Sequence, residues 1–149
     1  MFASEMINKI QMMNTLVPEE KLVVGGQPTI ADLKLLHSLG VKQVVNLRPN
    51  TEKNDFDEPQ LLKDLGIEYH SIPLTDISTF NKDSAFKVKC VLDLKQPTLV
   101  HCASGNRVGA LIALKAFWLE GLSPQESLDK GLQAGLTKLE PQVSQLLGL

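Results

Sequence analysis

The sequence is poor in cysteine, in aromatic residues and in surplus charge of either sign. It has two cysteines and one tryptophan among 149 residues, and aromatic residues make up 5% of the chain. Two cysteines cannot build the framework of bridges typical of small secreted domains, so we expect a cytoplasmic protein. Lys and Arg number 15 against 17 Asp and Glu, which gives a net charge of −2. Binding to nucleic acid requires clustered positive charge, so the sequence excludes a strongly basic nucleic-acid binder.

Long apolar runs are also missing. The uninterrupted apolar stretches are only a few residues long, far short of the ~20 residues that span a bilayer. The first segment carries Glu5 and Lys9 within its apolar pattern and lacks a small-residue cleavage site, which argues against a signal peptide and against membrane insertion. Hydrophobic residues at 43% and charged residues at 21% are typical of globular proteins, and the length predicts one domain over residues 1–149.

What the chain does have is a regular alternation of short apolar segments with amphipathic ones. The predicted strands are Leu22–Val24, Val41–Leu47, Ile67–Ile72 and Thr98–His101. The predicted helices are Ser4–Met13, a segment from Thr29 to Gly40, Glu58–Leu65, Asp83–Leu94, Gly109–Glu120, a segment from Ser123 to about Ala134, and Pro141–Leu147. Strands separated by helices predict an α/β fold: a mostly parallel sheet of about four strands with helices on both faces.

In such a sheet, ligands bind beyond the carboxyl ends of the strands. Three loops follow predicted strands and should therefore converge on one crevice. They begin at Arg48, at Pro73 and at Cys102.

The third loop carries the clearest chemistry, in the segment Val100–Gly109 (VHCASGNRVG). A thiol is nucleophilic only as a thiolate, and its pKa falls at a helix N-terminus among inward-pointing amides and a guanidinium. Those amides form a concave site for a tetrahedral anion, which Arg107 can hold through two oxygens. The small residues Ala103, Ser104 and Gly105 let the backbone curl around the anion. The pattern predicts that Cys102 attacks an oxyanionic phosphorus or sulfur centre.

The alternative for any cysteine is a buried residue that packs as a small hydrophobe. We adopt it for Cys90, which lies in the middle of a predicted helix. For Cys102 the conjunction of strand, His, small-residue loop, Arg and helix favours a functional anion site.

This segment resembles the cysteine-dependent dual-specificity phosphatases of the protein tyrosine phosphatase superfamily. The similarity runs from about Gly25 to Gly135. The segments Gly26–Pro28 (GQP) and Val44–Pro49 (VVNLRP) are similar to a bacterial branch of that superfamily. The resemblance implies a phosphotyrosine-phosphatase-like fold, and a phosphate-binding loop of Ala103, Ser104, Gly105, Asn106, Arg107 and Val108.

The loop departs from the superfamily pattern in its length. Phosphatases of this superfamily have five residues between Cys and Arg, whereas four separate Cys102 from Arg107. With the cysteines aligned, Val108 falls at the family's Arg position. The hydroxyl residue that usually follows the Arg is absent, and Ser104 is the candidate to replace it. A spacing of four is instead the loop length of rhodanese-like sulfurtransferases.

Four further residues are candidates for roles around the loop. Asp76 falls where these phosphatases carry their general acid, and the resemblance implies that it protonates the leaving oxygen and later activates water; Asp83 and Asp57 are weaker candidates. The resemblance also implies that His101 orders the loop and helps to keep the thiolate charged. Arg48 could contact substrate, but pairing with Glu52 or Asp55 is the favoured interpretation, and Asn46 is expected to brace the loops.

Three functions stay open at this point. The leading hypothesis is a metal-independent phosphatase that hydrolyses phosphate monoesters of an undetermined class through a phosphocysteine. The second is a rhodanese-like sulfurtransferase with a persulfide on Cys102, and the third is a catalytically silent anion-binding module. No cofactor is expected, and no Cys, His and carboxylate spacing indicates a metal site.

Overall fold

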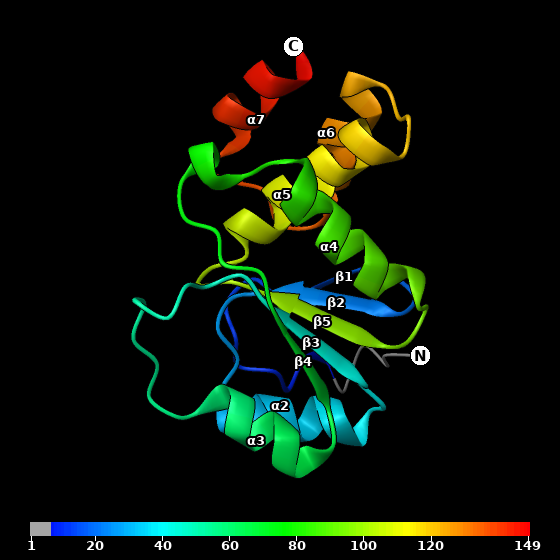
Figure 1. Ribbon diagram of the computed structural model, residues 1–149. Helices are drawn as coiled ribbons and strands as arrows, with labels where there is room; N and C mark the ends of the chain where they lie inside the picture. The colour runs from blue at the N-terminus through cyan, green and yellow to red at the C-terminus, as the bar shows by residue number, and fades with distance from the viewer. Residues whose placement is uncertain (1–6) are drawn as a thin grey trace.

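The computed structural model describes residues 7–149, which form a central five-stranded sheet with helices on both faces (Figure 1). The strand order is β1-β2-β5-β3-β4. The strands are β1 (Leu16–Glu19), β2 (Leu22–Gly25), β3 (Gln43–Asn46), β4 (Glu68–Ser71) and β5 (Thr98–His101). The helices are α2 (Ile30–Ser38), α3 (Glu58–Leu65), α4 (Lys82–Asp93), α5 (Asn106–Leu119), α6 (Pro124–Gln133) and α7 (Glu140–Leu147), with a 3₁₀ turn η1 (Ile77–Thr79). The predicted α/β class is confirmed.

The sheet separates two apolar layers because successive side chains of a strand point to opposite faces. Val24, Val45 and Val100 face the layer that contains α4, α5, α6 and α7. Their neighbours Val23, Val44 and Leu99 face the layer under α2 and α3. The central strands are therefore buried on both faces, which explains why each reads as a short continuous apolar run in the sequence.

Strand β1 is the one strand that the apolar pattern did not predict. It pairs antiparallel with β2 at the edge of the sheet, and its side chains are mostly exposed. An exposed edge strand needs no apolar alternation, and Pro18 is tolerated there because one side of the strand has no ladder partner. The other four strands run parallel to one another.

Three local predictions are wrong. Residues 8–13 of the predicted helix Ser4–Met13 form turns and coil, with Met12 buried, and residues 4–6 lie outside the described part. Helix α5 begins at Asn106 rather than Gly109, because the helix starts directly from the tight loop after β5. Cys90, expected in the core, is exposed, since it lies on the outer side of α4.

The carboxyl ends of the four parallel strands lie in a single row. Gly25 is in register with His101, His101 with Asn46, and Asn46 with Ser71. The loops that follow these residues leave the sheet from the same edge. The predicted convergence of the loops after β3, β4 and β5 is confirmed, and the turn after β2 joins them. Across residues 7–149, no helix combines the length and the apolar character of a membrane span.

Helix α5 is held at a close distance from the chain that follows α6. A Cβ atom on Gly109 would lie 2.1 Å from the backbone nitrogen of Leu136 and 2.7 Å from the carbonyl oxygen of Gly131. Backbone atoms cannot shift as a flexible side chain can. Glycine is therefore required at position 109 by packing, one turn beyond the start of the helix that carries Arg107.

We expect Gly109→Ala to lower the free energy of unfolding by roughly 1–3 kcal/mol, the usual range for overpacking, although alanine is the better helix former. Urea unfolding of the two proteins measures the difference. Lys130→Ala, an exposed change on the neighbouring helix α6, is the control and should stay within about 0.5 kcal/mol of the parent. Equal stability of Gly109→Ala and the parent would contradict the packing argument.

Candidate active site

The loop Cys102–Gly105 turns its carbonyl groups outward. The carbonyl oxygen of Ala103 accepts a hydrogen bond from the Gln27 amide at 3.1 Å, and that of Ser104 accepts one from the Asn14 side chain at 2.8 Å. Because a peptide carbonyl and the following amide point in opposite directions, this arrangement turns amides toward the inside of the loop. One of them, the Gly105 amide, donates to the Cys102 sulfur at 3.1 Å.

Two glycines make this loop possible. Gly105 has φ of +93°, in the left-handed region that side chains disfavour. A Cβ atom on Gly26 would lie 2.5 Å from the Ala103 carbonyl oxygen, so only glycine lets the turn after β2 approach the loop and form the bridge with Ser104. The loop is therefore braced by backbone contacts.

Helix α5 points its N-terminus at the same spot. Its first backbone hydrogen bond is donated by Gly109 to the Gly105 carbonyl at 3.1 Å. The amides of Asn106, Arg107 and Val108 belong to the first turn, whose N–H groups lack helical partners and favour an anion. Cys102 is fully buried at this end of the helix.

Two predicted phosphate-binding residues have their side chains elsewhere. The Val108 side chain is fully buried in the core, so a contact with an anion is restricted to its backbone amide. The Asn106 side chain accepts hydrogen bonds from the amides of Thr137 and Leu139, both at 3.1 Å. It therefore ties α5 to the segment before α7 rather than facing the loop.

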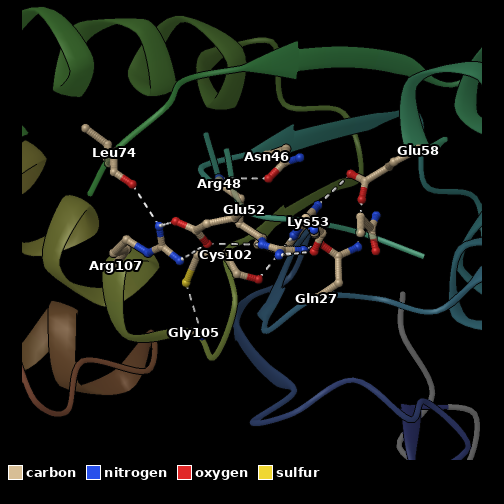
Figure 2. Close-up of polar contacts among 12 residues, drawn as sticks. Gln27, Asn46, Arg48, Glu52, Lys53, Glu58, Leu74, Cys102, Gly105 and Arg107 are labelled. Atoms are coloured by element: carbon tan, nitrogen blue, oxygen red, sulfur yellow. Dashed lines mark hydrogen bonds and ion pairs between the residues drawn. The ribbon is translucent and has the colours of Figure 1, made fainter. Parts of the chain in front are cut away.

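Arg107 is fixed by two partners outside the loop (Figure 2). Its Nη1 donates to Glu52 Oε2 at 2.7 Å and to the Leu74 carbonyl at 2.8 Å, and its Nη2 donates to Glu52 Oε1 at 2.8 Å. A guanidinium has five N–H donors in a planar fork. Glu52 takes the end-on edge and Leu74 the outer Nη1 hydrogen, so Nε–H and one Nη2–H are the donors left by the contacts among residues 7–149.

Those two remaining donors lie on the same edge of the guanidinium. A side-on edge of this kind binds two oxygens of a phosphate or carboxylate. The hydrogen bond with Glu52 and the nearby Cys102 thiol both raise the pKa of Arg107. Glu52 and Leu74 therefore hold a permanently charged guanidinium in one orientation, with one bidentate edge available beside Cys102.

Glu52 is shared between two arginines. Its Oε1 also accepts from Arg48 Nε at 3.2 Å, which confirms the predicted pairing of Arg48 with Glu52. The hydrogen bond from Arg107 lowers the pKa of Glu52, and the bond from Arg48 adds to that effect against the opposing influence of burial. Arg48 is itself held by the Gln27 side chain at 2.6 Å and the Lys53 carbonyl at 2.8 Å. Through Glu52, ion pairs therefore connect the loop after β3 to Arg107 at the start of α5.

Beneath the loop a buried carboxylate contacts a buried imidazole. Glu58, the first residue of α3, and His101, the last of β5, are 2% and 0% exposed. Glu58 Oε2 is 2.6 Å from His101 Nε2, and Glu58 Oε1 accepts from Gln27 Nε2 at 2.8 Å. Burial raises the pKa of Glu58, but the contacts with His101, Gln27 and Arg48 together outweigh burial, so the net direction is downward.

Asp76 lies in the loop after β4. It caps η1, where its carboxylate accepts hydrogen bonds from the amide and the hydroxyl of Ser78. Leu74, whose carbonyl contacts Arg107, is two residues earlier, so the Asp76 backbone lies within about 7 Å of Leu74. The weaker candidates have other partners, since Asp57 caps α3 and Asp83 pairs with Lys87.

The structure thus brings together Cys102, its loop, Arg107, His101 and Arg48. Asn46 accepts from the Arg48 amide at 2.8 Å and donates to the Tyr69 hydroxyl at 3.1 Å. The sequence analysis missed Glu58 as part of this region, and missed that Glu52 contacts Arg107. Glu58 begins a helix, where an acidic residue is ordinary, so no sequence signal distinguished it.

No group of three or more His, Cys, Asp or Glu side chains suited to a metal ion occurs in the described residues 7–149.

The chain matches one family over nearly its whole length. The family is described as a DSP-PTPase phosphatase fused to NAD+ kinase, and the match covers residues 4–145. Among curated proteins, the chain is 31% identical over 100 residues to a beta-lactamase hydrolase-like protein of Agrobacterium fabrum and 28% identical over 100 residues to one of Xylella fastidiosa. In both cases the match covers 64% of this chain and 23% of the relative, so the chain corresponds to less than a quarter of those proteins.

Solved structures share the fold. A DUF442 protein from Shewanella putrefaciens has a TM-score of 0.72 with 19% identity, covering 98% of this chain and 97% of that one. The catalytic core of the PP-IP phosphatase SIW14 from S. cerevisiae has a TM-score of 0.70 with 20% identity, covering 93% and 87%. TpbA of P. aeruginosa, solved with phosphotyrosine, has a TM-score of 0.67 with 20% identity, covering 92% and 86%.

The geometry of Arg107 predicts how the loop binds a tetrahedral oxyanion. In Glu52→Ala the end-on edge of the guanidinium loses its partner, so Arg107 is no longer held with its free edge beside Cys102. We expect the affinity for tungstate, measured by calorimetry, to fall about tenfold, the equivalent of one charge-assisted hydrogen bond.

Lys53→Ala is the matched control, because Arg48 contacts only the backbone carbonyl of Lys53. Its tungstate affinity should equal that of the parent. Tighter binding by Glu52→Ala would contradict this assignment, since it would mean that the Glu52 carboxylate competes with the anion.

Proposed function

Since the chain belongs to the family of DSP-PTPase phosphatases fused to NAD+ kinase, we propose that it hydrolyses phosphate monoesters through a phosphocysteine on Cys102. The observation that carries the proposal is the position of the Cys102 sulfur. It lies against the Gly105 amide, at the N-terminus of α5 and near Arg107. A nucleophile there is surrounded by donors suited to the three non-bridging oxygens of a phosphoryl group.

In the first step the Cys102 thiolate attacks phosphorus, a sulfur–phosphorus bond forms and the bond to the ester oxygen breaks. The loop amides and Arg107 stabilise the charge on the three equatorial oxygens. Asp76 protonates the leaving oxygen, for which its carboxyl must separate from Ser78 and turn toward Cys102. Its position two residues after Leu74 supports this role, since Leu74 contacts Arg107.

In the second step water attacks the phosphocysteine. Asp76, now ionised, accepts a proton from that water, the sulfur–phosphorus bond breaks, and inorganic phosphate leaves with the thiolate restored. No oxidant, reductant or metal enters this balance.

The short spacing between Cys102 and Arg107 is compatible with the proposal. Four residues intervene, yet Arg107 still lies in the first turn of α5, where its side chain reaches both Glu52 and Leu74. The shorter loop is held closed by Gly26 and Gln27 from the turn after β2. We propose that Ser104, in the middle of the loop, supplies the hydroxyl that helps the thiolate leave in the second step.

The substrate class stays open within phosphate esters. The fold neighbours include a phosphatase of PP-IP compounds and a protein solved with phosphotyrosine, which supports a phosphoryl group as the shared element. In this proposal the loop after β5 binds the phosphoryl group, and other parts of the protein would contact the rest of the substrate.

The nucleophile is tested with a chromogenic aryl phosphate in the presence of a chelator. We expect turnover by the reduced wild type and at least a 10³-fold loss in Cys102→Ser, because removing a nucleophile leaves only binding and electrostatic effects (about 10³ or more is usual). Cys90→Ser, at the other cysteine, should retain full activity. A folded, reduced wild type without turnover would contradict the proposal, and intact mass after thiosulfate would then distinguish a persulfide carrier from a silent binder.

The general acid is tested with Asp76→Asn. We expect turnover on esters with poor leaving groups to fall by roughly 10²-fold, with a smaller loss on aryl phosphates whose leaving groups need no proton. The fall of kcat on the alkaline side of the pH profile should also flatten, because it reports deprotonation of the acid. Asp83→Asn serves as control, since Asp83 pairs with Lys87 on α4. If Asp76→Asn keeps the parent profile on both ester types, another group supplies the proton.

A further inference from the structure

The buried pair of Glu58 and His101 determines the protonation state of the imidazole. His101 Nε2 faces a Glu58 oxygen at 2.6 Å, and its Nδ1 faces the Cys102 carbonyl oxygen at 3.4 Å. A carbonyl oxygen can only accept. An ionised carboxylate also can only accept, so each ring nitrogen must then carry a proton. His101 is then an imidazolium.

The ionised state of Glu58 rests on its own contacts. Its second oxygen accepts from the Gln27 amide group at 2.8 Å, and the polar contacts of Glu58 together lower its pKa. Gln27 is kept in that orientation because its own oxygen accepts from Arg48 at 2.6 Å. Arg48 therefore donates to Gln27, and Gln27 in turn donates to Glu58.

We propose that Glu58 is a positioning residue for the nucleophile: it keeps His101 as an imidazolium directly behind Cys102, so that a buried positive charge favours the thiolate. The charge matters because the pair is shielded from water, and electrostatic effects grow as the surroundings become less polar. An opposite charge within a few ångströms shifts a titration by roughly one to three units. The proposal deepens the function above, but it concerns the thiol itself and can be tested without turnover.

Other charged groups around the pair are few in the described residues. Arg48 lies near Glu58 and favours its ionised form, and burial beside Glu58 raises the pKa of the Tyr69 hydroxyl, which is therefore neutral near pH 7. Arg107 also lies beside Cys102, and its guanidinium pairs with Glu52. The proposed imidazolium of His101 is a second positive group near Cys102, and it pairs with Glu58 as Arg107 pairs with Glu52.

The test measures the alkylation rate of Cys102 by iodoacetamide as a function of pH, in a Cys90→Ser background so that a single thiol reacts. In Glu58→Gln the carboxylate charge is lost while the side chain keeps its size. Burial then favours a neutral imidazole, and the midpoint of alkylation should rise by about one pH unit. If the function above holds, the acidic limb of kcat/KM for the aryl phosphate should rise by a similar amount.

Asp32→Asn is the matched control. Asp32 is also a buried carboxylate, but it caps α2 through the amides of Thr29 and Gln11. Its loss should leave the alkylation midpoint unchanged. A midpoint in Glu58→Gln within about 0.3 unit of the parent, well below the shift expected from a close charge, would overturn the proposal, as would an equal shift in Asp32→Asn.

A double variant separates an effect through His101 from a general loosening. In a His101→Asn background the imidazole is already absent, so Glu58→Gln should shift the midpoint no further. An undiminished second shift would show that Glu58 acts by another route and would overturn the proposal. If Glu58→Gln does not fold, Glu58→Asp decides: its shorter carboxylate weakens the bond to Nε2, and an unchanged midpoint counts against the role.

The two proposals fail separately. If Glu58→Gln shifts the alkylation midpoint of Cys102 but the wild type does not hydrolyse phosphate esters, the role of Glu58 is supported and the phosphatase activity is contradicted. Turnover by a wild type whose alkylation midpoint does not depend on Glu58 supports the phosphatase activity and contradicts the role of Glu58.

Discussion

The loop after β5 has to turn several backbone amides inward around one sulfur atom, and much of the structure serves that requirement. Inward amides leave outward carbonyls, and buried carbonyls need donors. Gln27 and Asn14 provide them, and Gly26 allows the approach. These residues precede the loop by more than 70 positions in the sequence, but the parallel register of β2 and β5 places them directly beside it.

Two sets of hydrogen-bonded charged and polar residues lie near the Cys102 sulfur. On one side, Glu52 joins Arg107 to Arg48; on the other, Glu58 stands between Gln27 and His101. Gln27 connects the two sets because its amide oxygen binds Arg48 while its nitrogen binds Glu58. Both carboxylates have hydrogen-bonding partners, which the buried Glu58 in particular requires. The site therefore carries two positive groups toward Cys102, each with an acid behind it.

Much of this architecture could be predicted from the sequence because it depends on local patterns. Short apolar runs identified the four parallel strands, and Thr29 and Ser123 marked helix starts through side-chain caps. The spacing of Cys102, Gly105 and Arg107 located the anion loop, since a strand followed at once by small residues and a helix has few other uses. Strand β1 was missed because an exposed edge carries no apolar alternation.

The sequence by itself determined the four parallel strands, the loop, and the cysteine and arginine that flank it, because adjacent residues encode those features. Only the tertiary structure decided which acidic residues contact Arg107 and His101. Glu52 and Glu58 are ordinary acidic residues on a loop and at a helix start, and their roles come from groups 55 and 43 positions away. Pairing over such distances depends on strand register and on burial, which a single sequence does not display.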